Sequence, residues 1–261
     1  MQSRALSPFG IEFGDIQIGR IGPHHANDLI PGLCEAIARH RVAVFRDQEA
    51  DDPDLTGFLM LLGDLMFTEG EAPVDGAPSL NIVSNVGRTT PPRSVFHSDT
   101  SYVNRPPAFT AMRTVVLPEV GGATLFSDQV AAAASLRPAT VTWLRDRTLL
   151  HGTIGHDGRR HEQRHPVLRR HPATGETALF LSTPERCTQL SGVDEQTSRR
   201  MVRALYQRSI RPSHLYAHRW QNRDIVVWDN RITMHRADHA GVVGDRVLHR
   251  GLVKGEVPIA A

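Results

Sequence analysis

The sequence has few cysteines, and this scarcity limits the chemistry that the chain can perform. Its 261 residues include only Cys34 and Cys187. Two thiols are too few for a disulfide framework or for a zinc site built mainly from cysteine. This favours a reducing compartment, and because the N-terminus opens no signal-peptide pattern we expect a cytoplasmic protein.

Lysine and long apolar runs are also scarce. Lys254 is the only lysine, which leaves little room for Schiff-base catalysis or a phosphate-binding lysine of the Walker type. No apolar run reaches the length that crosses a membrane, so no membrane partner is expected. The formal net charge is +2, and the arginines are spread along the chain. A nucleic-acid partner is therefore not expected either.

The remaining composition is that of an ordinary globular protein, with 40% hydrophobic and 22% charged residues. Apolar periodicity predicts helices at 28–39, 54–66, 127–135, 138–145 and 193–209. It predicts strands at 41–46, 79–86, 94–102, 108–117, 123–126, 177–181, 224–228 and 246–253. Because the helices do not alternate strictly with the strands, we predict a mostly β fold with helical insertions and a jelly-roll core.

The chain organisation is predicted to be one domain over residues 1–261, since β folds of this length often form a single unit. The turn at 118–122 predicts that strands 108–117 and 123–126 pair antiparallel. Two polar stretches, at about 67–94 and 152–172, are predicted to be lid loops. Whether the chain forms a homo-oligomer stays open.

A short motif, His97-Ser98-Asp99, carries the first sign of chemistry. On the predicted strand 94–102, residues two apart face the same side, so the imidazole and the carboxylate would converge. Two histidines and one carboxylate on one face of iron(II) form a known type of metal site. His235, which follows the strand 224–228, is the candidate second histidine, and His239 and His249 are competing choices.

Two arginines near the C-terminus indicate an anionic ligand. Arg246 and Arg250 are four residues apart in the predicted final strand, so both face the same side. Two inward guanidinium groups beside a metal would be costly unless carboxylates accompany them. The pattern therefore favours a dicarboxylate cosubstrate.

At this point the sequence resembles the family of iron(II)- and 2-oxoglutarate-dependent dioxygenases typified by taurine dioxygenase and 2,4-dichlorophenoxyacetate dioxygenase. The matching pieces run in family order over nearly the whole chain. They are residues 39–48, 96–99 and 118–126, His165-Pro166 through 171–175, 228–231 with 233–235, and 246–250.

The resemblance implies a role for several of these residues. His97, Asp99 and His235 would hold Fe(II) and form the catalytic centre. Thr124 and Arg246 would bind the distal carboxylate of 2-oxoglutarate, and Arg250 would lie near its C1 carboxylate and the substrate. With O2 as the oxidant, the implied reaction hydroxylates, desaturates or cyclises an unactivated carbon of a small molecule and releases succinate and CO2.

The sequence differs from the taurine dioxygenase pattern at positions where that enzyme binds its substrate. Thr68 replaces a histidine that contacts the sulfonate, and Arg93 replaces an asparagine. Taurine is therefore not the expected substrate, and an acid at Glu69 or Glu71 could pair with an amino group instead. The candidate substrate-binding residues are Thr68, Glu69, Glu71, Arg93, Ser101 and Tyr102.

Two alternative functions remain at this stage. The first is a non-catalytic jelly-roll protein that binds a small molecule. The second is a zinc hydrolase, because His161-Glu162-Gln163-Arg164-His165 matches the H-E-x-x-H string. That string needs a helix, and the polar window around it ends at Pro166, which disfavours one.

Overall fold

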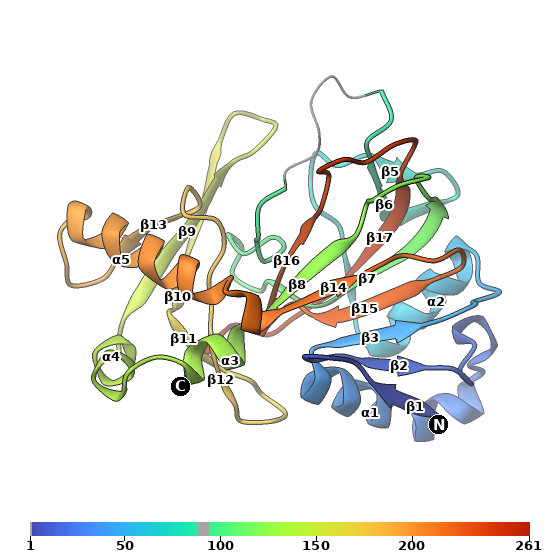
Figure 1. Cartoon of the computed structure of the whole chain (residues 1–261), viewed down its shortest axis with the longest axis horizontal. Helices are drawn as coiled ribbons and strands as arrows, with labels where there is room; N and C mark the ends of the chain where they lie inside the picture. The colour runs from blue at the N-terminus through green and yellow to red at the C-terminus, as the bar shows by residue number, and fades with distance from the viewer. Residues whose placement is uncertain (1, 88–93) are drawn as a thin grey trace.

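A computed structural model describes residues 2–87 and 94–261. Within those ranges the largest element is a nine-stranded sheet (Figure 1). Its strands follow the order β1 (Ser3–Ala5), β2 (Ile11–Phe13), β3 (Val42–Phe45), β15 (Ile225–Asp229), β7 (Pro107–Val116), β17 (Val247–Lys254), β6 (Ala77–Ser84) and β5 (Pro73–Val74), with β4 (Leu65–Met66) beside β17. The pair β2 and β3 is parallel, whereas β7 is antiparallel to both of its neighbours.

A smaller sheet packs against one face of the large sheet. It has the order β14 (Leu215–His218), β8 (Thr124–Asp128) and β16 (Thr233–Ala237). Phe126 and Tyr216 from this sheet share a buried cluster with Trp228 and Leu248 from the large sheet. The two sheets therefore form the layers of a sandwich with an apolar interior.

Helices cover the opposite face of the large sheet. Ile37 of α1 (Pro23–His40) and Phe58 of α2 (Asp52–Leu62) share a second buried cluster with Phe45 and Val227 of the sheet. The helix α2 begins at a capping box between Asp51 and Asp54. It ends before Gly63, earlier than the predicted residue 66, because Leu65–Met66 forms β4 against β17.

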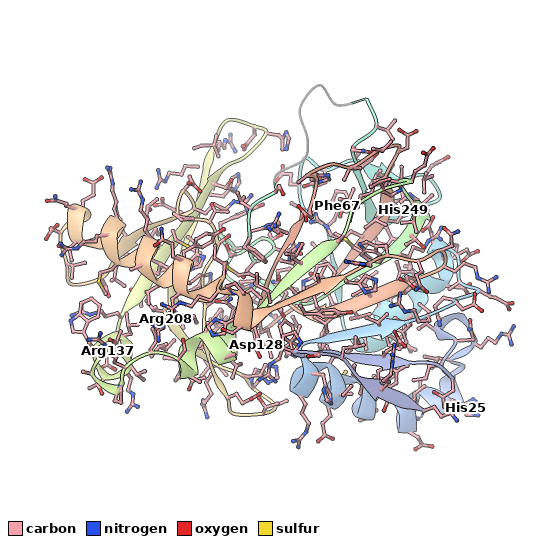
Figure 2. All side chains as sticks on the ribbon, viewed as in Figure 1. His25, Phe67, Asp128, Arg137, Arg208 and His249 are labelled. Carbon is pink, nitrogen blue, oxygen red and sulfur yellow. The ribbon has the colours of Figure 1, made fainter. Side chains whose placement is uncertain are left out.

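The remaining elements form a separate layer beyond the small sheet. The helices are α3 (Gln129–Ala134), α4 (Pro138–Leu144) and α5 (Glu195–Ser209), with a short 3-10 turn at Pro212–His214. A second 3-10 turn, Ile18–Arg20, belongs instead to the helical side of the large sheet, where Ile18 is buried in the same cluster as α1 and α2. One three-stranded sheet has the order β10 (Arg160–Pro166), β9 (Thr148–Ile154) and β13 (Cys187–Leu190), and another has the order β12 (Thr177–Leu179), β11 (Leu168–Arg170) and β18 (Ile259–Ala260). Arg208 of α5, which is labelled in Figure 2, donates to Ser135 at the end of α3 and so joins the two helices.

The predicted fold class, mostly β with helical insertions, is confirmed, but the predicted pairing of the strands around residue 120 is wrong. Strand β7 pairs with β15 and β17, whereas β8 pairs with β14 and β16 in the other sheet. Gly121 and Gly122 both have positive φ. The turn that they form carries the chain from one layer to the other rather than back along β7.

The predicted lid loops are only partly irregular. Residues 152–172 are mainly strand, because β9 and β10 form an antiparallel hairpin and β11 follows. Within 67–94, β5 and all of β6 are regular as well, and β6 corresponds to the strand predicted at 79–86. The remainder of that stretch includes residues 88–93, which lie outside the described residues. Over the part of the chain that the structure describes, no helix has the length and apolar character needed to cross a bilayer.

Candidate metal centre

The backbone joins the two candidate histidine ligands. His97 donates its N–H to the carbonyl of His235 at 3.0 Å, and His235 returns the bond to His97 at 2.9 Å. This exchange is an isolated bridge, so the predicted strand over 94–102 is wrong. His235 lies on β16, which is held in the small sheet by β8. The pairing therefore fixes His97 beside β16 without a regular strand.

Asp99 is oriented by side chains from the large sheet and the loop after β15. Its N–H donates to Asn230 Oδ1 at 2.9 Å, and Asn230 Nδ2 donates to the carbonyl of Pro107 at 3.2 Å. Thr110 donates to Asp99 Oδ2 at 3.0 Å, and Arg250 donates to Asp99 Oδ1 at the same distance. The carboxylate is therefore held in one orientation before any metal binds.

These contacts bring three ligand atoms together. His97 Nε2 lies 3.7 Å from Asp99 Oδ1, and His235 Nε2 lies 3.8 Å from Asp99 Oδ2. All three ligand atoms lie within 4.8 Å of one another, and in the described residues this is the one group of three or more such side chains that could hold a metal. Two imidazoles and one carboxylate are the donor set of a facial iron(II) site.

The protonation states suit metal binding. Burial lowers the pKa of His235 to about 3 and also lowers the pKa of His97, so both imidazoles are neutral near pH 7. Burial alone would raise the pKa of Asp99, but the Arg250 guanidinium and the two imidazoles outweigh it and hold that pKa well below its usual range. The residues present therefore fit a divalent metal.

Neighbouring groups orient the two rings. His97 Nδ1 lies 3.0 Å from the carbonyl of Val95, and a proton on Nδ1 leaves Nε2 free to bind a metal. The ring of His235 packs 4.6 Å from Trp228 and 6.4 Å from Phe126, measured between ring centroids. The apolar core between the two sheets thus supports one side of the centre.

A buried arginine lies close to the strand that carries this centre. Arg246 is 1% exposed, and it donates to the carbonyl of Gly122 at 2.9 Å and to Thr124 Oγ1 at 3.2 Å. Burial lowers its pKa to about 10, so it remains charged at neutral pH. No carboxylate among the described residues pairs with it. Because an unpaired buried cation is costly, this site is suited to an anionic ligand.

Arg250 is the second predicted arginine, and it also faces the centre. It is 8% exposed, and besides Asp99 it contacts Asn81 and Glu71. The competing ligand candidates do not join the centre: His249 contacts Asp52 on the other side of β17, and His239 lies outside the metal-ligand group. The inward orientation of Arg246 and Arg250 agrees with the prediction from their spacing.

The candidate substrate residues divide into several groups. The hydroxyls of Thr68 and Thr100 lie 3.1 Å apart, and the Tyr102 ring lies 5.7 Å from the guanidinium carbon of Arg186. The burial of Tyr102 raises the pKa of its hydroxyl. Ser101 is fully buried, and Glu69 is exposed. Arg93 lies outside the described residues.

The structure does not support the zinc-hydrolase alternative. The H-E-x-x-H string lies on strand β10 rather than on a helix. His165 Nε2 lies 3.1 Å from the carbonyl of Val103, and His161 pairs with Asp157. These two imidazoles thus serve packing and surface contacts, and the string lacks the helical geometry that a metalloprotease needs.

Sequence reasoning gave no role to two residues that shape the centre, and for Asp229 it left open whether the side chain orders the turn before His235 or accepts a hydrogen bond behind the metal ligands. Asn230 and Asn81 were not singled out, although Asn230 lies in one of the matched pieces. Asp229 is fully buried, accepts from Arg231 at 2.8 Å and lies 3.0 Å from His171 Nε2. The signal available was the run of polar residues 229–231 directly after a fully apolar strand, where a polar side chain must find a buried partner.

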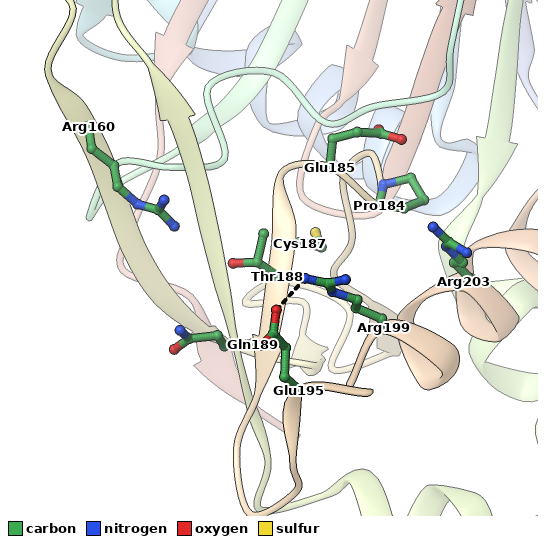
Figure 3. A pocket seen from close by; sticks show the side chains of 9 residues that line it. All are labelled: Arg160, Pro184, Glu185, Cys187, Thr188, Gln189, Glu195, Arg199 and Arg203. Carbon is green, nitrogen blue, oxygen red and sulfur yellow. Dashed lines mark hydrogen bonds and ion pairs between the residues drawn. The ribbon is translucent and has the colours of Figure 1, made fainter. Parts of the chain in front are cut away.

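A separate surface hollow of about 450 Å³ lies between β10, β13 and α5 (Figure 3). Arg160, Arg199 and Arg203 line it together with Glu185 and Glu195. Arg199 pairs with Glu195 there. None of the three metal-ligand candidates lines this hollow.

Comparison with known proteins agrees with this geometry. The family model described as taurine catabolism dioxygenase TauD, TfdA family, matches residues 2–252. The alpha-ketoglutarate-dependent sulfate ester dioxygenase of Pseudomonas putida is 29% identical over 257 residues, which cover 88% of this chain and 82% of that protein. The alpha-ketoglutarate-dependent 2,4-dichlorophenoxyacetate dioxygenase of Burkholderia sp. (strain RASC) is 26% identical over 207 residues, covering 74% and 67%.

A solved structure shows the same fold. The crystal structure of a taurine dioxygenase from Burkholderia xenovorans superposes with a TM-score of 0.85 at 27% identity, covering 99% of this chain and 92% of that one. The sandwich described above, with open sheets, therefore corresponds to the jelly roll of these enzymes. The chain belongs to the TauD/TfdA family and is a non-haem iron dioxygenase that uses Fe(II) and 2-oxoglutarate.

Proposed function

We propose that this dioxygenase binds Fe(II) through His97, Asp99 and His235 and hydroxylates an unactivated carbon of a small organic anion, with release of succinate and CO2. The observation that carries the assignment is the convergence of the three ligand atoms within 4.8 Å. Bound Fe(II) with 2-oxoglutarate supplies the chemistry, which is oxidative decarboxylation of the cosubstrate by O2 coupled to oxidation of a C–H bond. Desaturation or ring closure by the same centre is the alternative outcome.

The chain's own residues position the cosubstrate. The charged, buried Arg246 is suited to the distal carboxylate of 2-oxoglutarate, because a guanidinium binds a carboxylate with charge-assisted hydrogen bonds. Thr124 Oγ1 already accepts from Arg246 and from Trp220 Nε1. Its own proton is therefore left to donate to the same carboxylate. Arg250 lies beside Asp99 and provides a second cation close to the metal ligands.

The charges around the centre support an anionic substrate. Fe(II) with Asp99 carries one net positive charge, and the two charges of 2-oxoglutarate are matched by Arg246 and Arg250. Arg186 adds a further positive charge near Tyr102, and Glu71 removes one. The described groups with metal and cosubstrate thus sum to one net positive charge, which one substrate anion would balance. The similar proteins whose names specify a sulfate ester and 2,4-dichlorophenoxyacetate also act on anions.

The test is an aerobic assay with Fe(II), 2-oxoglutarate and a panel of alkyl sulfates, sulfonates and aryloxyalkanoates. We expect succinate to form above an iron-free control, and one panel member to be converted to an oxidised product. Asp99→Ala removes a ligand and should lower succinate formation at least about a hundredfold. Glu162→Gln, which alters only the H-E-x-x-H string, should leave it unchanged. Full activity in Asp99→Ala would contradict the assignment.

A further inference from the structure

Three acceptors surround the guanidinium group of Arg250. Its Nε donates to Asn81 Oδ1 at 3.1 Å, and its Nη1 donates to Asp99 Oδ1 at 3.0 Å. Its Nη2 faces Glu71 Oε1 at 3.7 Å, which is an ion pair but beyond hydrogen-bond distance. Two sides of the guanidinium are therefore fixed by close contacts, and the third has a loose partner.

Asn81 has a donor to spare at this place. It lies on β6 directly opposite Arg250 on β17 and is 2% exposed. Its Oδ1 must face Arg250, because the guanidinium offers only donors, so its amide nitrogen points elsewhere. Within the described residues that nitrogen has no hydrogen-bond partner. A buried amide donor without a partner is costly, which indicates that a ligand supplies the missing acceptor.

Glu71 is the distant partner of Arg250, and its position allows its carboxylate to move away from the guanidinium. It lies between β4 and β5, two residues before Pro73, which pairs with Asn81 across the sheet. The N–H of Glu71 donates to the carbonyl of Thr68 at 3.2 Å, so the backbone is held by a turn. Its side chain is 38% exposed. Water can therefore solvate the carboxylate once it moves off Arg250.

We propose, building on the function proposed above and on the anion site that the resemblance places at Arg250, that Asn81 donates to a carboxylate or sulfo group bound there and that Glu71 competes with this group for Arg250. Arg250 supplies the charge through Nη2, and Asn81 supplies the spare amide donor. Glu71 then lowers the affinity of this anion site and restricts it to anions strong enough to displace a carboxylate. The oxyanion comes either from the C1 end of 2-oxoglutarate or from the substrate.

Anaerobic titrations distinguish these two sources. In the first arm, 2-oxoglutarate is added to the Fe(II) protein and the metal-to-ligand charge-transfer band gives its Kd. In the second arm, 2,4-dichlorophenoxyacetate or hexyl sulfate is added at saturating 2-oxoglutarate, and the perturbation of the band gives the Kd of the probe. Glu71→Gln should tighten binding about two- to fivefold in one arm, the range expected for loss of a partly exposed ion pair. That arm identifies the source of the oxyanion.

Two further variants complete the design. Asp75→Asn removes one negative charge from the exposed turn between β5 and β6 and should leave both Kd values unchanged. Asn81→Asp keeps an acceptor for Arg250 but replaces the spare donor, so it should weaken binding about tenfold in the arm that Glu71→Gln strengthens. Asn81→Ser should give a similar loss without the added charge.

The outcomes separate this inference from the proposed function. The competition is refuted if Glu71→Gln, like Asp75→Asn, leaves the Kd unchanged in both arms. It is refuted as well if neither substrate probe binds and the Kd of 2-oxoglutarate does not change. Wild-type affinity in Asn81→Asp and Asn81→Ser would refute the donor role of Asn81. A charge-transfer band in the wild type would still support the metal and cosubstrate assignment, and its complete absence would refute that assignment instead.

Discussion

At the scale of single residues, the buried ion pair between Asp229 and Arg231 lies next to Asn230, which holds a metal ligand in place. Both side chains are buried, and Asp229 directly precedes Asn230, which holds the backbone of Asp99. The Arg231 guanidinium outweighs the effect of burial and keeps the pKa of Asp229 below its usual range. The charge of Asp229 therefore contributes to the local geometry that Asp99 requires.

Asp229→Asn should destabilise the protein by about 3 kcal/mol, because it leaves the Arg231 charge buried without its close partner. Urea unfolding at pH 7, followed by circular dichroism, measures the change. Glu35→Gln, which breaks an exposed ion pair with Arg39, serves as the control and should shift the midpoint little. An equal shift in the two variants would show that the buried pair has no special role.

Two buried histidines determine how the stability of the protein should change with pH. Burial lowers the pKa of His151 to about 3 and that of His165 to about 4, whereas an unfolded histidine titrates near 6.5. Between about pH 6.5 and 4 the unfolded chain therefore binds protons that the folded chain does not. The free energy of unfolding should fall as the pH drops through this window, by at most about 1.4 kcal/mol per pH unit for each histidine.

His165→Gln tests this expectation because it removes one titrating group and keeps an amide donor for the carbonyl of Val103. The difference in unfolding free energy between pH 7 and pH 5 should be smaller in the variant than in the wild type. Identical slopes in the two proteins would contradict the assigned direction of the pKa shift.

At the scale of elements, sequence patterns located most helices and strands but not their partners. The helices at 28–39 and 193–209 correspond to α1 and α5, because each carries an amphipathic face that the core must cover. The hairpin of β9 and β10 lies largely in the stretch at 152–172 that is predicted as a lid loop. Its second strand reads Arg-His-Glu-Gln-Arg-His-Pro, and most of its side chains lie at the surface. Without an apolar stripe, a strand gives no periodic signal.

The metal ligands show a related limit. His97 and Asp99 were expected to converge through strand geometry, yet they converge through a bridge to His235 and a bond from Asp99 to Asn230. These contacts join residues more than 130 positions apart in sequence. Local spacing therefore identified the ligand types, whereas their arrangement depends on contacts that no local pattern encodes.

The start of α2 provides a prediction at this scale. Asp51 Oδ1 accepts from the N–H of Asp54 at 2.9 Å, and Asp54 Oδ2 accepts from the N–H of Asp51. Asp51→Ala should lower the free energy of unfolding by about 1 kcal/mol, because it leaves the first turn without its cap. The urea midpoint of Asp51→Ala, set against that of Asp75→Ala in an exposed turn, measures the effect. Equal midpoints would count against the capping role.

At the scale of the whole molecule, the three buried clusters share their supporting elements. Strand β15 contributes Val227 to the cluster under the helices and Trp228 to the cluster between the sheets. Strand β16 contributes Met234 to the third cluster, which contains α5. We therefore propose that residues 1–261 fold as one domain.

Differential scanning calorimetry should show a single transition whose calorimetric and van't Hoff enthalpies agree. Two resolved transitions, or a van't Hoff enthalpy well below the calorimetric value, would instead indicate that the layer around α5 unfolds separately. The pH should be held near 7 so that the titration of the buried histidines does not contribute.

The proposed chemistry requires His97, Asp99 and His235 to act together as the ligands of one ferrous ion. Anaerobic addition of Fe(II) and 2-oxoglutarate, followed by visible absorption spectroscopy, tests this most directly. The wild type should develop a metal-to-ligand charge-transfer band that saturates at one iron per chain, and His235→Ala should not develop it under the same conditions. A band of full intensity in His235→Ala would contradict the assignment.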